Sequence, residues 1–144
     1  MNLVRKVPFV AIRKAIFKLL KEGQDTQVFG RVPIKNAELP YIVLSSTNCI
    51  PTSVKDVVIW DVKMEIDAYT DNNNSIKLNE ILNDIVTLIS GYADDLEVED
   101  YSIIETNVEN VETYEAESNC WYGQVTVRFQ LQYKTDISDE TTIP

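Results

Sequence analysis

Asp61, Lys63, Glu65 and Asp67 alternate with apolar residues along one segment of the sequence. In an extended strand, side chains two positions apart point to the same face, so this spacing places three carboxylates and one amine on a single surface. Asp61, Glu65 and Asp67 could hold a metal ion in a metal-dependent hydrolase such as a nuclease. A solvated strand face with charges that pair across strands explains the same pattern, and short motifs often arise by chance. The solvated face is the favoured interpretation, and the hydrolase is kept as an alternative.

A second polar segment, residues 71–75, resembles the start of a calcium-binding loop. Such a loop needs glycine at its sixth position and glutamate at its twelfth, which here are Ile76 and Leu82. The segment is therefore predicted to be a turn that leads into a helix.

The chain has no histidine, which removes the usual base of a nucleophilic triad and the commonest metal ligand. Ser45, Ser46 and Ser53 consequently lack an activating partner. Cys49 and Cys120 are far apart in the sequence and form no CxxC pair, so a zinc site is not expected and two buried free thiols are favoured over a disulfide. Four glycines do not form a phosphate-binding loop. The sequence predicts neither an enzyme nor a cofactor.

Two amphipathic helices are expected. In residues 8–22 one apolar stripe is formed by Phe9, Ile12, Ile16, Leu19 and Leu20. In residues 75–90 a broader stripe is formed by Leu78, Ile81, Leu82, Ile85, Leu88 and Ile89. Gly23 and Gly91 are placed as the residues that end these helices.

The remaining periodicity is that of strands. Residues 57–69 and 121–133 alternate between apolar and polar side chains, which predicts two long strands with one buried face. Residues 27–37, which contain Pro33, indicate an edge strand or arm, and residues 41–44 a short buried strand. Residues 101–114 alternate imperfectly, as in a bulged or edge strand. Residues 47–56 and 94–100 are predicted to be loops.

This order of elements predicts an α+β fold with two layers, in which two helices pack on one face of a mostly antiparallel, curved sheet. A length of 144 residues suits one domain, expected over residues 1–134, with residues 135–144 as a flexible C-terminal tail. Arg13, Lys14 and Lys18 interrupt the apolar positions after Met1, so no secretory signal is predicted, and no apolar run is long enough for a membrane span. We expect the chain to be made in the cytoplasm of its host cell.

Charge is divided unevenly along the chain, whose net charge is −10. Residues 1–35 carry eight basic and two acidic side chains, and the other residues carry five basic and twenty-one acidic ones. No Lys or Arg occurs from Leu78 to Val127, which argues against wrapping nucleic acid. A basic first helix and an acidic second half suit head-to-tail self-association, although a solvated acidic surface explains the second half as well.

A family resemblance covers about residues 5–134. The first helix is followed by residues 28–33 (VFGRVP) and 38–44 (ELPYIVL), then by the long strand, a polar turn, the second helix and the final long strand. This pattern resembles the phage tail terminator family, also called tail-completion or head-to-tail joining proteins. The resemblance implies a structural virion protein without catalytic residues, found in the phage tail or neck.

The resemblance further implies a homo-oligomer, typically a hexameric ring. Such a ring caps the tail tube, ends its polymerisation and meets the head connector, while DNA passes through without specific binding. Candidate contacts between subunits or rings are Arg13, Lys14, Lys18, Lys21, Arg31, Pro33, Asn48 and Pro51. Candidate residues of an acidic lumen are Asp94, Asp95, Glu97, Glu99 and Asp100. Another neck or head-completion ring protein and a monomeric acidic binding module remain alternatives.

Overall fold

The computed structural model describes residues 6–31, 37–52, 56–71, 74–116 and 120–134. The elements in these residues are α1 (Phe9–Gly23), β1 (Gln27–Phe29), β2 (Tyr41–Pro51), β3 (Ile59–Asp71), α2 (Ser75–Tyr92), a 3-10 turn η1 (Ala93–Asp95), β4 (Tyr101–Ala116) and β5 (Cys120–Tyr133). The strands form one sheet in the order β1-β2-β3-β5-β4. Only β1 runs parallel to its neighbour, so the expected α+β fold with a mostly antiparallel sheet is confirmed.

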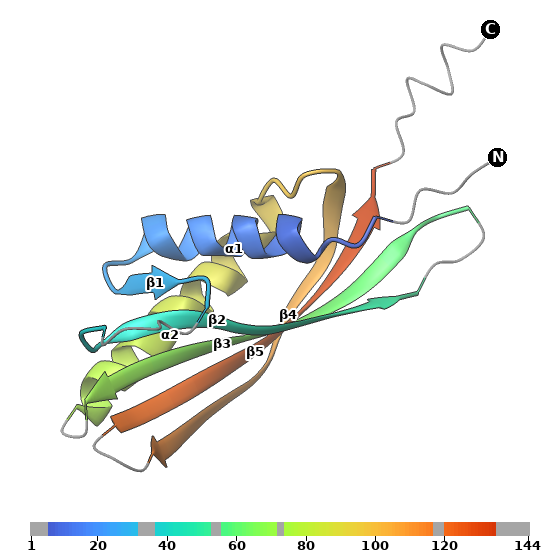
Figure 1. Cartoon of the computed structure of the whole chain (residues 1–144). Helices are drawn as coiled ribbons and strands as arrows, with labels where there is room; N and C mark the ends of the chain where they lie inside the picture. The colour runs from blue at the N-terminus through green and yellow to red at the C-terminus, as the bar shows by residue number, and fades with distance from the viewer. Residues whose placement is uncertain (1–5, 32–36, 53–55, 72–73, 117–119, 135–144) are drawn as a thin grey trace, which may run out of the picture.

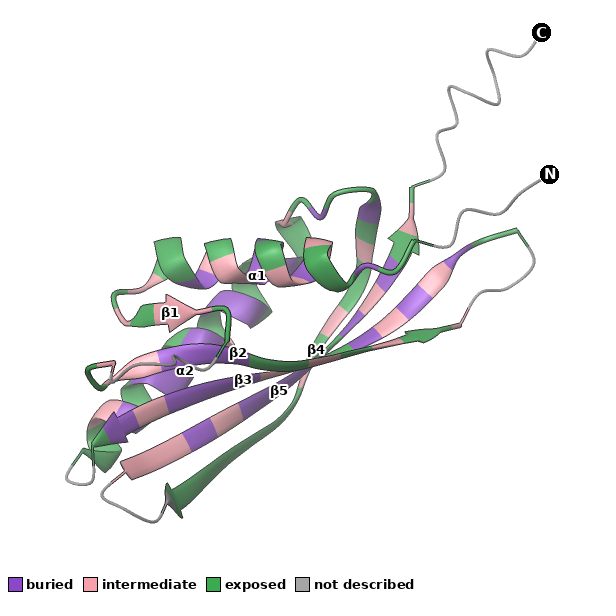
Figure 2. Ribbon diagram, in the orientation of Figure 1, coloured by how far each residue is buried: buried purple, intermediate pink, exposed green. Residues whose placement is uncertain are grey.

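Both helices pack on one face of the sheet, α1 over β1 and β2 and α2 over β3, β4 and β5 (Figure 1). The predicted stripe of α1 meets the sheet through Ile12, Ile16 and Leu20, all of which are fully buried. The buried residues of α2 are the six that the sequence predicted. Figure 2 shows the resulting core as a buried band between the helices and the central strands.

The two long strands form the centre of the sheet and are paired with each other along thirteen residues. Val62, Met64 and Ile66 of β3 face the helices and are fully buried, and the alternate residues face away. The same alternation holds in β5, where Val127 and Phe129 are fully buried and Arg128 is exposed. The sheet therefore has one covered face and one face without a helix on it, called here the open face.

The predicted loop at residues 47–56 is wrong over its first half. β2 continues to Pro51 and pairs with β3 as far as Trp60, with a bulge between Leu44 and Thr47. The reason is that the long β3 presents backbone groups that need partners, and the polar residues after Leu44 satisfy them once the bulge has shifted the register. Residues 53–55 lie outside the described part of the chain.

β4 is a sixteen-residue edge strand with register shifts between Ile103 and Glu105 and between Val108 and Asn110. These bulges account for its imperfect alternation, as the sequence predicted. Gly91 does not end α2, because the helix continues through Tyr92 and passes directly into η1. No helix in the described ranges is long and apolar enough to cross a membrane.

Candidate functional site

Arg13, one of the predicted contact residues, forms hydrogen bonds within its own subunit through its side chain. Its guanidinium donates hydrogen bonds to Thr47 Oγ1 at 2.9 Å, to the Leu44 carbonyl oxygen at 3.0 Å and to the Gly30 carbonyl oxygen. The group also lies 5.3 Å from the ring centroid of Phe9, and partial burial lowers the pKa of Arg13. Arg13 thus ties α1 to the end of β1 and to the bulge of β2.

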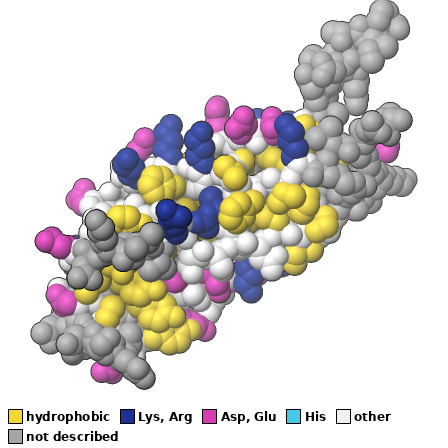
Figure 3. Space-filling view, in the orientation of Figure 1, with side chains coloured by type: hydrophobic (Ala, Val, Ile, Leu, Met, Phe, Trp, Pro, Cys, Tyr) yellow, Lys and Arg dark blue, Asp and Glu magenta, His cyan; other side chains and the backbone are white. Residues whose placement is uncertain are grey.

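The three lysines of α1 lie on its outer side. Lys14, Lys18 and Lys21 are exposed, and within the described ranges no ion pair joins them to a carboxylate of their own subunit. Lys21 Nζ lies 6.0 Å from the ring centroid of Phe17. Figure 3 shows the Lys and Arg side chains gathered along α1, next to hydrophobic side chains.

Exposed hydrophobic side chains occur in the first turn of α1 and in the segment just before it. Val7, Phe9 and Val10 are 58%, 44% and 70% exposed. A shallow groove of about 300 Å³ begins beside them, with Phe17 and Leu44 in its lining. We call Val7, Phe9, Val10, Lys14, Lys18 and Lys21 the helix surface.

The predicted lumen residues all lie at the end of α2, next to α1 of the same subunit. Asp94 and Asp95 are in η1, and Glu97, Glu99 and Asp100 follow it; each is exposed. Asp100 Oδ2 lies 3.3 Å from Lys6 Nζ, an ion pair at the surface.

A groove of about 480 Å³ lies between this acidic segment and the lysines of α1. Glu97, Glu99 and Asp100 line one side of the groove, and Lys14 and Lys18 line the other. Basic and acidic groups that are far apart in the sequence are therefore neighbours within one subunit.

The other predicted contact residues do not join the helix surface. Arg31 is exposed just after β1, and Pro51 is exposed at the end of β2. Asn48 is exposed and pairs with Lys63, so it lies on the open face, away from α1. Pro33 lies outside the described residues. The predicted set thus divides between the helix layer and the opposite side of the sheet.

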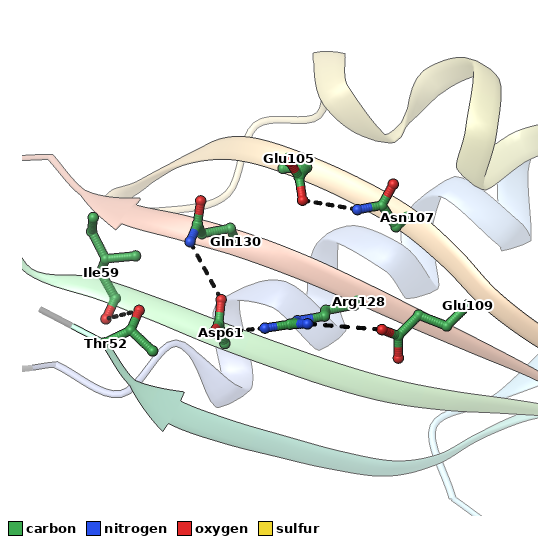
Figure 4. Close-up of polar contacts among 8 residues, drawn as sticks. All are labelled: Thr52, Ile59, Asp61, Glu105, Asn107, Glu109, Arg128 and Gln130. Atoms are coloured by element: carbon green, nitrogen blue, oxygen red, sulfur yellow. Dashed lines mark hydrogen bonds and ion pairs between the residues drawn. The ribbon is translucent and has the colours of Figure 1, made fainter.

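The carboxylates of β3 point from the open face and are each held by a neighbouring strand. Arg128 Nη2 of β5 donates to Asp61 Oδ2 at 3.0 Å, and its Nη1 lies 3.9 Å from Glu109 Oε2 of β4 (Figure 4). The Ser46 hydroxyl, on the bulge of β2, donates to Glu65 Oε1. The ion pair with Asp61 raises the pKa of Arg128. These contacts are the cross-strand pairing expected of a solvated strand face.

The geometry does not favour the hydrolase alternative. Along a strand, Asp61 and Glu65 are about 13 Å apart, which is beyond the span of one ion. In the described part of the chain, no three His, Cys, Asp or Glu side chains are grouped so that they could hold a metal ion. Residues 72–73, in the segment compared with a calcium-binding loop, and Ser53 lie outside the described residues. Cys49 and Cys120 are half-buried free thiols, and burial raises the pKa of each.

Sequence periodicity alone does not reveal an aromatic row that crosses the whole open face. Adjacent ring centroids are separated by 5.6 Å, 5.2 Å, 5.2 Å and 4.9 Å along the series Phe29, Tyr41, Tyr69, Tyr122 and Tyr114, with one ring from each strand. Burial, followed by the nearby Asp67 carboxylate, raises the pKa of Tyr69 to about 12. We call these five residues the tyrosine row. Only the pairing register brings them together.

Two carboxylates lie beside the tyrosine row. Asp67 lies on the same strand as Tyr69 and is 6% exposed, with its Oδ1 accepting a hydrogen bond from Gln124 Nε2 at 3.0 Å. Burial raises the pKa of Asp67, and the hydrogen bonds from Gln124 and Ser45 partly oppose that shift. At the edge strand, the Tyr114 hydroxyl donates to Glu112 Oε2. The open face is therefore aromatic and acidic at this end.

A protein family and a solved structure of the same fold match this chain. The family model described as tail completion protein gp17 matches residues 14–132. A chain in the virion of a native gene transfer agent particle has the same fold, with a TM-score of 0.77 and 14% sequence identity. The alignment covers 86% of this chain and 96% of that one. No curated protein matches the sequence.

The family match begins within α1 and includes α2, β3 and nearly all of β5, whose packing forms most of the core described above. It also excludes the hydrolase alternative, because the family is one of structural proteins rather than enzymes. The sequence-based expectation of a structural protein of the phage tail is confirmed. The chain belongs to the tail completion protein gp17 family and is a structural component of a phage-like virion.

Proposed function

We propose that this protein is a tail terminator, a ring of identical subunits that caps the tail tube, ends its polymerisation and joins the tail to the head connector. The family match over residues 14–132 carries the proposal, since it assigns the chain to tail completion. The ring, its expected six copies and the head connector as a partner go beyond that match.

The division of charge supports a role around DNA rather than on it. Glu97, Glu99 and Asp100 are exposed at one end of the subunit, and the chain from Leu78 to Val127 has no basic residue to neutralise phosphate. Arranged around an axis, the acidic segment 94–100 would present negative charge to the lumen and let DNA pass without binding.

A capping assay tests the proposal. Tube protein from the same virus is polymerised with and without this chain, and tube lengths are measured by electron microscopy. We expect the chain to stop elongation and to label one end of each tube. Tubes that elongate unchanged would show that the protein is not a terminator, and binding to isolated heads instead would identify a head-completion protein.

The mass of the protein in solution complements that assay. Light scattering on a sizing column, over a range of concentrations and salt, should detect an oligomer of about six copies of the 16.4 kDa chain. A strict monomer that also fails to cap tubes would favour the monomeric binding module.

A further inference from the structure

We infer that the tyrosine row on the open face of one subunit binds the helix surface of a second copy of this chain. This inference rests on the proposed function, because it names the surfaces through which the ring would close. The two surfaces lie on different layers of the subunit, the tyrosine row on the sheet and the helix surface on and just before α1. Only the fold brings the residues of the tyrosine row together.

The tyrosine row has the composition of a protein contact. Tyr69, Tyr122 and Tyr114 stack on one another across three strands, and each residue is partly exposed, Tyr114 by 39%. Aromatic pairs across strands stabilise a sheet by themselves, but they do not require exposed rings along its full width. Tyrosine is enriched where proteins bind one another, because it offers a large rigid surface with a polar end.

Charge next to the tyrosine row specifies the partner. Glu112 lies in the adjacent row of the open face, beside Gln124 and the buried Asp67, and Glu65 lies one row further. These two rows contain no Lys or Arg among the described residues. The partner is therefore expected to carry an apolar centre with basic groups beside it.

The helix surface of this same chain has that chemistry. Val7, Phe9 and Val10 are exposed, and Lys14 and Lys18 follow them on α1 without an ion pair in the described part of the subunit. The exposed apolar side chains would cover the tyrosine rings, and the lysines would meet Glu65 and Glu112. Figure 3 shows hydrophobic side chains along α1 and more of them at the lower left, over the strand ends.

The charges of the two surfaces favour a head-to-tail contact between the two copies. Tyrosine row against tyrosine row would bring carboxylates together, and helix surface against helix surface would bring lysines together, so a symmetric dimer is disfavoured. A contact between two different surfaces leaves one of each free at the ends of every pair. Such contacts continue until they close into a ring.

The experiment uses two variants, each lacking one of the two surfaces. Lys14→Glu with Lys18→Glu reverses the charge of the helix surface, and Glu112→Gln with Tyr114→Ser removes the charge and the ring of the tyrosine row at the edge strand. All four substituted side chains are exposed, and an unchanged circular dichroism spectrum and urea midpoint would show that the variants fold. Lys77→Glu, on α2 and outside both surfaces, is the matched charge control.

We expect each variant alone to associate about tenfold more weakly than the parent chain or worse, and the control to assemble normally. An equal mixture of the two variants retains one intact contact, between the tyrosine row of the first and the helix surface of the second. The mixture should therefore stop at a heterodimer of twice 16.4 kDa, and added salt should weaken it.

Three results would overturn the inference: assembly of either folded variant at the parent's affinity, a mixture that stays monomeric, or a parent chain that is monomeric at every concentration. None of these decides the proposed function, which the capping assay tests separately. A protein that caps tubes through rings insensitive to these substitutions is a terminator whose subunits meet elsewhere.

Discussion

Removal of the Arg13 side chain should destabilise the protein far more than its position on a helix surface suggests. Two of its hydrogen bonds, to Thr47 Oγ1 at 2.9 Å and to the Leu44 carbonyl oxygen at 3.0 Å, are partly buried. A hydrogen bond from a charged group contributes about 1.5–3 kcal/mol, and partial exposure argues for the lower end. Arg13→Ala should therefore lower the free energy of unfolding by about 3 kcal/mol.

The assay is urea unfolding at 25 °C, followed by fluorescence of Trp60 and Trp121. With an m-value of about 2 kcal/mol/M, the Arg13→Ala midpoint should fall by about 1.5 M. Lys14→Ala is the matched control on the same helix, since Lys14 is exposed, and it should change stability by no more than about 0.5 kcal/mol. Arg13→Lys keeps the charge but cannot reach both acceptors, and it should fall between the two.

A double-mutant cycle identifies the contact responsible. If Arg13 stabilises the fold through the bulge of β2, Arg13→Ala and Thr47→Val should show a coupling energy of about 1 kcal/mol. The reasoning is refuted if Arg13→Ala unfolds within about 0.5 kcal/mol of the parent chain, or if the two substitutions are additive. The first result would mean that water satisfies these acceptors as well as the guanidinium does, and the second that the hydrogen bond to Thr47 Oγ1 does not stabilise the fold.

Two further predictions concern the sheet. A Cβ at Gly123 would lie 2.7 Å from Cδ1 of the buried Leu82, so Gly123→Ala should cost about 1–3 kcal/mol in urea unfolding, whereas Gly30→Ala, with nothing within 4 Å, should be neutral; equal midpoints would contradict this packing. Burial raises the pKa of Asp67, so its ionisation opposes folding above the pKa of the unfolded chain, and that cost disappears as pH falls through both values. The free energy of unfolding of Asp67→Asn, relative to that of the parent chain, should therefore increase as the pH is raised from about 3.5 to about 7. A difference that does not depend on pH would contradict the burial argument.

The local pattern of apolar residues was sufficient to predict most of the helices and strands. The helical stripes that contain Ile12 and Ile16, and Leu78 and Ile85, predicted two helices and the side of each that is buried. Alternation in β3 and β5 predicted two long strands and a sheet with one covered face. These predictions succeeded because burial of one face imposes a period of 3.6 or 2 residues directly on the chain.

The prediction at residues 47–56 failed for the opposite reason. Polar residues after Leu44 carry the signature of a loop, but β3 is long enough to pair with them, and a bulge corrects the register. Strand length at such a place is decided by a partner that is distant in sequence. The same applies to Arg13, which the sequence presents as a surface charge, because its acceptors just after β1 and on β2 are distant in the sequence.

The candidate surfaces divide in the same way. Composition by itself determined that the chain has no histidine and that a basic first quarter precedes an acidic remainder, which disfavoured triad catalysis and nucleic-acid wrapping. Only the tertiary structure placed Glu97 and Asp100 beside the lysines of α1, and only the strand order β1-β2-β3-β5-β4 aligned Tyr69, Tyr122 and Tyr114 in one row. Periodicity records which side of its own element a residue occupies, whereas its neighbours across the sheet depend on pairing register, which many distant residues set together.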